Sequence, residues 1–263
     1  MLQVTRDQVI KALQDVGVVP GDGLLIHSAL HFLGHPLDGI DIYYQALCAV
    51  LDKNPQPDAS LQQGTLAVPT FNFAFARGEP YDPQRTPSVG MGAFSEYIRQ
   101  LPQAQRTSHP MQSLAVIGRH AADVAGRDTL SAFDPGSAFE RLLELDFKLL
   151  LLGADIQAVA MLHYCEQRAS VPYRYWKDFT GRVNTSQGWQ TRTYRMFVRR
   201  MEIDPKIELY PVQALLEGRR QWFSTPLNYG RVSLCRLKDF VAAVDEFLQR
   251  DPWSLVVNRP AQA

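Results

Sequence analysis

The apolar run KLLLLG, at residues 148–153, constrains the fold more than any other stretch of the chain. A short, continuous apolar run of this kind, closed by glycine, is typical of a strand buried on both faces of a sheet. Similar runs occur at residues 23–27, 64–69 and 114–118. Together the four runs predict an α/β protein with a mostly parallel central sheet.

Segments of helical periodicity alternate with these strands. The sequence TRDQ at residues 5–8 fits a capping box, and it predicts a helix that Gly17 and Pro20 bring to an end. Residues 181–199 predict a hairpin, which is an antiparallel addition near the C-terminus. The other expected helices span residues 41–51, 91–101, 137–145, 157–169 and 237–248.

The size and composition of the chain bear on its domain organisation. A chain of 263 residues, 46% of them hydrophobic, has enough apolar material for one large core. We therefore expect a single domain over residues 1–263. Within it, the region that contains the hairpin, at about 180–235, is expected to form a sub-lobe.

Charge and cysteine content exclude several classes of partner. Lys and Arg number 27, as do Asp and Glu, so the chain lacks the basic surface that nucleic-acid binding needs. The opening sequence MLQVTRDQVI does not resemble a signal peptide, and no stretch approaches the ~18 apolar residues of a membrane span. Three widely spaced cysteines without a CxxC pair indicate reduced thiols. We expect a cytoplasmic protein that binds neither nucleic acid nor a membrane.

Three of the six histidines lie at intervals of four residues in HSALHFLGH, residues 27–35. On a helix this spacing would stack the imidazoles, as a metal site requires. The segment, however, begins at the end of a strand and contains Gly34 before Pro36, so no helix and no metal are predicted. The phosphate-binding motifs GxxxxGK[ST] and GxGxxG, the hydrolase motif GxSxG and the zinc motif HExxH are also absent from the sequence.

The strongest candidate for catalysis is the pair His163 and Glu166, which follows the buried run at 148–153. Residues three apart share one face of a helix, so the carboxylate can contact the imidazole. A carboxylate in this position fixes the tautomer of the imidazole and raises its basicity, and such an imidazole can act as a general base. An ordinary His–Glu pair on the surface is the alternative, and the spacing alone leaves both open.

Polar residues at strand ends suggest where a ligand would lie. Ligands of open α/β sheets bind outside the carboxyl ends of the strands, and three predicted strands end in small or polar residues near 27, 69 and 153. The loop RTSHPMQS at residues 106–113 adds a guanidinium, hydroxyls and an imidazole. Such a cluster suits a phosphate or another polar ligand, although ordinary polar loops contain the same residues.

Taken in order, these segments resemble the aminoglycoside 3-N-acetyltransferase family, which transfers acetyl groups from acetyl-CoA to antibiotics. The resemblance rests on LLIHSAL, GTLAVPTF, RTSHPMQSLAVIG, DPGSAFERLLELDFKLLLLG and MLHYCEQRASVP, which extend over most of the chain. It implies a three-layer α/β/α sandwich unlike the common GNAT acetyltransferases. It also implies an antibiotic-resistance enzyme that uses acetyl-CoA as cosubstrate and a small-molecule amine as acceptor. A homodimer is a possible assembly.

The resemblance further implies roles for individual residues. His163 would be the general base and Glu166 its orienting partner. Arg106 would contact a CoA phosphate, while backbone N–H groups near Ser28 or the Thr70 hydroxyl would stabilise the oxyanion. The residues expected to bind acetyl-CoA are His27, Ser28, Ala29, Thr70, Met91, Gly92, Arg106, Ser108 and Ser113, and those expected to bind the acceptor are His31, Phe71, Asn72, Phe73, Glu79 and Asp82.

Two departures from the family pattern leave the acceptor open. The first motif, usually HSSLS, is HSALH at residues 27–31. The expected acceptor loop is aromatic, and it offers only Glu79 and Asp82 as carboxylates, beside Arg77 and Arg85. A nucleotide-linked amino sugar destined for a surface polysaccharide is therefore an alternative to an aminoglycoside. A non-catalytic module that binds CoA or a metal is the second alternative.

Overall fold

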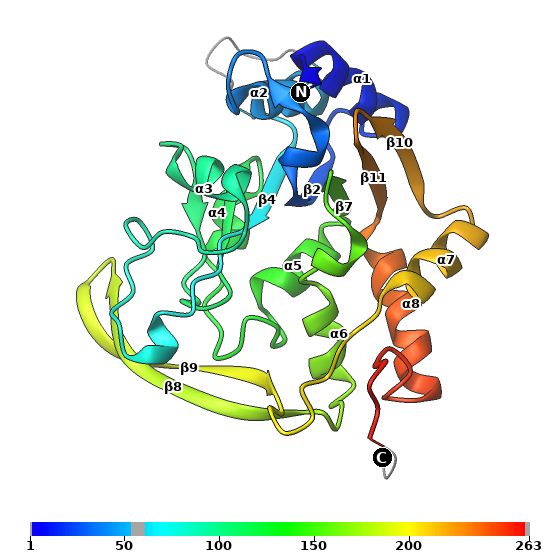
Figure 1. Cartoon of the computed structure of the whole chain (residues 1–263). Coiled ribbons are helices and arrows are strands. Elements are labelled where there is room, and N and C mark those ends of the chain that lie inside the picture. Colours follow the sequence, from blue (N-terminus) through cyan, green and yellow to red (C-terminus); the bar gives the residue numbers. More distant parts are fainter. Residues whose placement is uncertain (1, 54–60, 261–263) are drawn as a thin grey trace.

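Seven strands form the central sheet of the computed structural model, which describes residues 2–53 and 61–260 (Figure 1). Four of them are the apolar runs of the sequence: β2 (Gly23–Ser28), β4 (Thr65–Pro69), β6 (Leu114–Gly118) and β7 (Lys148–Leu152). The others are β5 (Gln105–Arg106), β10 (Phe223–Leu227) and β11 (Gly230–Arg236). Their order is β10-β11-β7-β2-β4-β6-β5, which puts β2 at the centre of the sheet.

The predicted α/β class is confirmed, and the parallel strands lie at the middle of the sheet. Strand β2 is parallel to both of its neighbours, with Ile26 opposite Leu150 of β7 and Leu24 opposite Leu66 of β4. The other strand pairs of this seven-stranded sheet are antiparallel. The carboxyl ends of β2, β4 and β7 therefore lie along one edge, where a ligand of such a sheet is expected.

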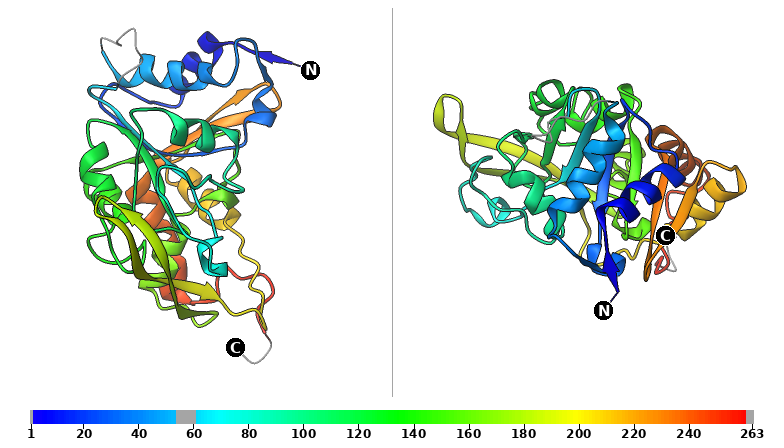
Figure 2. Two further views of the ribbon diagram at one scale, coloured as in Figure 1. Left: turned by 90° about the vertical axis from the view of Figure 1, so that its left-hand side faces the viewer. Right: turned by 90° about the horizontal axis from the view of Figure 1, so that it is seen from above.

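Alternate residues of the central strands point to opposite faces of the sheet and pack against different helices. Leu24 and Ile26 belong to a core on one face, and Leu25 belongs to a core on the other. Helices lie on both sides of the sheet in Figures 1 and 2, so the predicted three-layer sandwich is confirmed. The first face carries α1 (Arg6–Asp15), α2 (Asp41–Leu51) and α3 (Ala93–Gln100), and the second carries α4 (Ala121–Ala125), α5 (Ala138–Glu144), α6 (Leu162–Arg168), α7 (Tyr210–Gly218) and α8 (Leu237–Arg250).

The helix predicted at residues 157–169 is wrong in its first half. Asp155 accepts a hydrogen bond from the backbone N–H of Gln157 and closes a short 3-10 turn, Ile156–Ala158. Val159 is then extended, with ψ of 106°, and α6 begins only at Leu162. Helix α7 has no counterpart among the predicted helices. None of the helices within residues 2–53 and 61–260 combines the length and the apolar character that crossing a membrane demands.

A long antiparallel hairpin, β8 (Arg174–Thr185) and β9 (Gly188–Arg199), forms a sheet of its own and curves along the lower edge of Figure 1. The predicted hairpin is present, but it begins at Arg174 and not at residue 181. Its first part is largely exposed and carries aromatic and charged residues in no regular alternation, so the two-residue period of a strand is hidden there. A bridge between Tyr81 and Val183 joins the hairpin to the loop that follows β4.

Candidate active site

Helix α6 presents an imidazole and a carboxylate on one face. The Nδ1 atom of His163 lies 2.7 Å from Oε2 of Glu166, so the contact predicted from their spacing is present. The Glu166 side chain is completely buried, whereas 36% of the His163 side chain is exposed. The carboxylate therefore lies behind the imidazole, and the imidazole itself reaches a cavity.

Arg174, the first residue of β8, completes this group. Its Nη2 atom lies 2.8 Å from Oε2 of Glu166, and its side chain is only 12% exposed. Burial alone would raise the pKa of Glu166, but the hydrogen bond with His163 and the charge of Arg174 together lower that pKa below its ordinary value. The ionised carboxylate accepts the proton of Nδ1, which leaves the Nε2 lone pair of His163 free to take up a proton.

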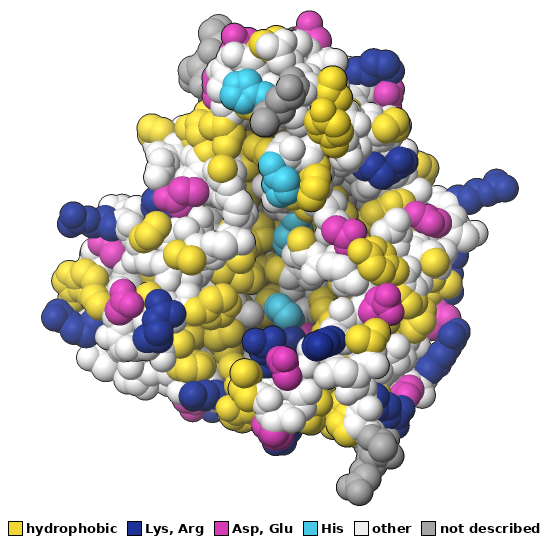
Figure 3. Space-filling view, in the orientation of Figure 1, with side chains coloured by type: hydrophobic (Ala, Val, Ile, Leu, Met, Phe, Trp, Pro, Cys, Tyr) yellow, Lys and Arg dark blue, Asp and Glu magenta, His cyan; other side chains and the backbone are white. Residues whose placement is uncertain are grey.

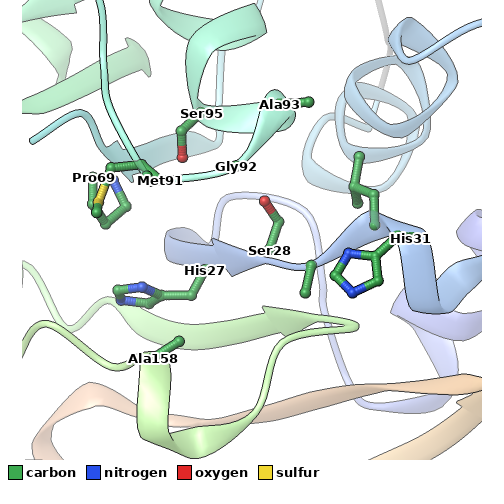
Figure 4. Close-up of a pocket in the computed structure, with 12 residues that line it drawn as sticks. His27, Ser28, His31, Pro69, Met91, Gly92, Ala93, Ser95 and Ala158 are labelled. Atoms are coloured by element: carbon green, nitrogen blue, oxygen red, sulfur yellow. The ribbon is translucent and has the colours of Figure 1, made fainter.

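A cavity of about 520 Å³ opens at the carboxyl end of β2 (Figure 4). His27, Ser28 and Ala29 line one side of it, and Met91 and Gly92, which precede α3, line the other. The structure thus brings together five of the residues expected to bind acetyl-CoA. No side chain caps the N-terminus of α3, so its first N–H groups are open to an anion. Two further lining residues are Ser95, which was not predicted, and His31, which was expected on the acceptor side.

The evenly spaced histidines do not stack. His27 is buried at the end of β2, where its Nε2 atom accepts a hydrogen bond from Ala160 N at 3.4 Å, and burial lowers its pKa to about 4. The chain then enters a 3-10 helix, Leu30–Leu33, and the short strand β3 (His35–Pro36). Across the described part of the chain, no group of three or more His, Cys, Asp or Glu side chains is placed to hold a metal ion.

A second cavity, of about 560 Å³, has His163 in its wall. Phe71 and Phe73, both expected to contact the acceptor, also line it. In Figure 3 the middle of this face is hollowed, and histidine side chains (cyan) follow one another along the hollow. The opposite wall belongs to the hairpin, which the sequence did not connect with the site, and it includes Arg174, Tyr175, Lys177, Phe179, Met196 and Arg199.

The side chains of Arg106, Thr70 and Ser113, which were expected to bind acetyl-CoA, contact one another. The Arg106 guanidinium donates to the hydroxyl oxygens of Thr70 at 3.1 Å and Ser113 at 3.0 Å. It also donates to the backbone carbonyls of Thr70, Pro83 and Thr86. Its donors are therefore taken by the protein itself, and neither the guanidinium nor the two buried hydroxyls line the cavity at β2 or the one at His163.

Replacing Arg106 with Gln is expected to lower the free energy of unfolding by about 2 kcal/mol, because a charged donor shared by several carbonyls is lost. Denaturant unfolding measures this effect. The matched control is Arg119→Gln at an exposed arginine, where a change within about 0.5 kcal/mol is expected. Equal stability of the two variants would contradict a bracing role for Arg106.

Four other residues expected to bind a ligand lie outside the cavities at β2 and at His163. Asn72 shapes a turn, since its Oδ1 accepts a hydrogen bond from the N–H of Ala74 at 2.8 Å, and its Nδ2 donates to the distant carbonyl of Pro87 at 2.8 Å. Glu79 is exposed and lies 3.6 Å from Arg77. Ser108 and Asp82 line a separate cavity of about 660 Å³.

The donors expected for the oxyanion have partners within the protein. The Ala29 N–H donates to the carbonyl of Leu152 at 2.9 Å, which continues the pairing of β2 with β7 beyond Ser28. The Thr70 hydroxyl, the other expected donor, is buried and donates to the carbonyl of Ser113 at 3.2 Å.

Comparison with known proteins yields consistent matches. The sequence profile of a family described as aminoglycoside 3-N-acetyltransferase matches residues 25–249. Aminoglycoside N(3)-acetyltransferase III of Salmonella sp is 30% identical over 200 residues, which cover 71% of this chain and 70% of that protein. The structure of AAC-IIIb with CoASH superposes with a TM-score of 0.81 at 22% identity, over 98% of this chain and 100% of that one. A variant of AAC(3)-IVa in complex with a gentamicin matches with a TM-score of 0.77 at 25% identity, over 100% of this chain and 94% of that one.

Proposed function

The chain belongs to the aminoglycoside 3-N-acetyltransferase family, and from this premise we propose that it transfers the acetyl group of acetyl-CoA to a primary amine of an aminoglycoside or a related amino sugar. The observation that carries the proposal is the group formed by His163, Glu166 and Arg174 at the wall of a cavity. An imidazole that is fixed through Nδ1 and open at Nε2 suits the removal of a proton from an amine.

In this proposal His163 acts as the general base. At neutral pH a sugar amine is mostly an ammonium ion, which has no lone pair to attack a thioester. One ammonium proton passes through Nε2 of His163 to solvent, which leaves a neutral amine. As the amine nitrogen then bonds to the acetyl carbon, Nε2 takes a second proton from that nitrogen, and the carbon–sulfur bond breaks to release CoA thiolate. The proton held by His163 can then pass to the thiolate, which restores the base. Glu166 stabilises the imidazolium formed on the way.

Acetyl-CoA is the cosubstrate in this proposal, and we assign the cavity at the end of β2 to it. The uncapped N-terminus of α3 offers N–H groups to a phosphate or to an amide carbonyl of the pantetheine chain. The hydroxyls of Ser28 and Ser95 both line this cavity (Figure 4). Together these groups replace Arg106 as the anchors we propose for the cosubstrate.

Gly92 gives a test of this assignment. Its φ is 84°, and a Cβ atom at this position would lie 3.2 Å from the carbonyl oxygen of Ser28. Gly92→Ala is expected to narrow the cavity and to weaken CoA binding about tenfold in calorimetry. Gly78→Ala is the matched control, because Gly78 has φ of 90° and an added Cβ would meet nothing within 4 Å. Both variants should lose stability, and equal CoA affinities would overturn the assignment.

The proposed activity is tested by incubating the protein with acetyl-CoA and either kanamycin, gentamicin or glucosamine, and by measuring release of free thiol. Turnover with at least one of these amines, together with a mass increase of one acetyl group on that amine, is the expected result. Binding of CoA without turnover of any amine would favour a non-catalytic CoA-binding module.

Two further proposals concern the setting of the enzyme. We propose a cytoplasmic location, which three buried cysteine thiols outside any disulfide support. We also propose a homodimer, because the exposed apolar side chains of Leu2, Phe32, Leu37 and Tyr229 lie around β1 (Gln3–Val4), β3 and the β10–β11 turn. Light scattering during gel filtration should then give twice the chain mass of 29.7 kDa.

A further inference from the structure

The cavity at His163 carries positive charge and no negative charge in its lining. Its charged lining residues are Arg174, Lys177 and Arg199, and neither Asp nor Glu is among the described residues that line it. Arg174 is compensated by Glu166 from behind, and Arg199 lies 3.2 Å from Asp204. An amine with several positive charges would therefore meet like charge in this cavity.

Lys177 is the cation of this wall that stays uncompensated. It forms no ion pair with any residue within 2–53 and 61–260, and its ammonium lies 5.2 Å from the centre of the Phe179 ring. In the hairpin it stands opposite Met196 and shares its face of β8 with Tyr175 and Phe179, which also line the cavity. Its charge thus faces the cavity and is available to an anion.

Nearby carboxylates that could meet a polycation are directed elsewhere. Asp178 follows Lys177 but lies on the other face of β8, where its Oδ1 is 2.6 Å from Arg195. Asp82 lines the separate 660 Å³ cavity and accepts a hydrogen bond from Asn184. Apart from His163, Gln112 and Tyr175, the residues that line the cavity are cationic or apolar.

From this lining, and on the premise of the proposed function, we infer that the preferred acceptor is an amino sugar that carries a phosphate group, either a sugar phosphate or a nucleoside-diphosphate sugar. The amine faces His163, and the phosphate lies against Lys177. The aromatic rings of Phe71, Phe73 and Phe179 cover the apolar face of the sugar ring or of a base. An aminoglycoside, which has several ammonium groups and no anion, lacks a partner for Lys177.

The test compares matched acceptors in the presence of CoA or acetyl-CoA. Kanamycin, glucosamine, glucosamine 6-phosphate and uridine-diphosphate glucosamine are titrated into the protein–CoA complex by calorimetry, and thiol release is measured with acetyl-CoA. We expect both phosphorylated amines to bind about tenfold more tightly than glucosamine and kanamycin. The phosphorylated amine that binds more tightly shows whether the acceptor is a sugar phosphate or a nucleoside-diphosphate sugar. Tighter binding of kanamycin would overturn the inference.

Lys177→Gln tests the anchor itself. It is expected to raise the dissociation constant and the KM of the phosphorylated amine about tenfold, and to change those of glucosamine much less. Lys11→Gln on α1 is the matched control, since it removes the same charge from an exposed site in another layer. Equal losses for phosphorylated and plain amines would contradict the role of Lys177. Tight binding of the phosphorylated amine without any turnover would refute the proposed activity and leave the binding preference intact.

Discussion

Replacing His163 with Ala is expected to lower kcat by about 10²–10⁴-fold, because the amine then loses the group that removes its proton. The imidazole is held by Glu166 and reaches the cavity, so its loss removes a group from the cavity wall and leaves the hydrophobic core intact. Steady-state thiol release with the best acceptor measures the effect. CoA binding by calorimetry should stay unchanged, since His163 does not line the cavity at β2.

A matched control for this variant is His120→Ala, at a half-exposed histidine that precedes α4. The control should retain full activity. The His120→Ala variant should unfold like the wild type. The His163→Ala variant should lose no more than about 1.5–3 kcal/mol, because the buried Glu166 loses one hydrogen bond but keeps Arg174 as its partner. Near-normal turnover of the His163→Ala protein would remove the assignment of His163 as the base.

Replacing Glu166 with Gln has the second large effect, and it acts on both activity and stability. Loss of the carboxylate frees the tautomer of His163, which in carboxylate–imidazole pairs lowers kcat by up to about 10⁴-fold. It also leaves the nearly buried cation of Arg174 without its partner, which costs about 3–5 kcal/mol. Glu166→Asp keeps the negative charge near Arg174 but shortens the side chain that holds His163. This variant should therefore lose less stability than Glu166→Gln, while its kcat should still fall.

The pH dependence separates this mechanism from a general loss of packing. The pKa of Glu166 is lower in the folded protein than its ordinary value of 4.5, so its ionised form contributes stability above that value. The contribution is lost as the pH falls through the lowered pKa. The stability difference between wild type and the Glu166→Gln variant should therefore be constant near neutral pH and shrink below pH 4.5. A difference that does not change with pH would contradict the charge-based account.

Local patterns were enough to predict the central strands and the contact inside α6. The runs at β2, β4, β6 and β7 are buried on both faces, and such strands are continuous apolar stretches that no other element of this length explains. His163 and Glu166 are three residues apart on one helix, so their contact follows from helical geometry alone.

Contacts between distant segments could not be predicted in the same way. Arg174 pairs with Glu166 from a different element, beyond Pro172, where no periodicity relates the two. For Arg106 the sequence favoured a ligand contact that the structure does not show. A guanidinium suits a phosphate, but this one donates hydrogen bonds to backbone carbonyls of a loop about twenty residues earlier in the chain. Only the folded chain shows whether a guanidinium is free or already satisfied.

The placement of Arg174 at the very start of the hairpin separates two groups of side chains. Arg174 contacts Glu166, whereas Tyr175, Lys177 and Phe179 line the cavity away from that carboxylate. Point substitutions along the rest of β8 and β9 should therefore change the acceptor preference while the contact between His163 and Glu166 stays in place.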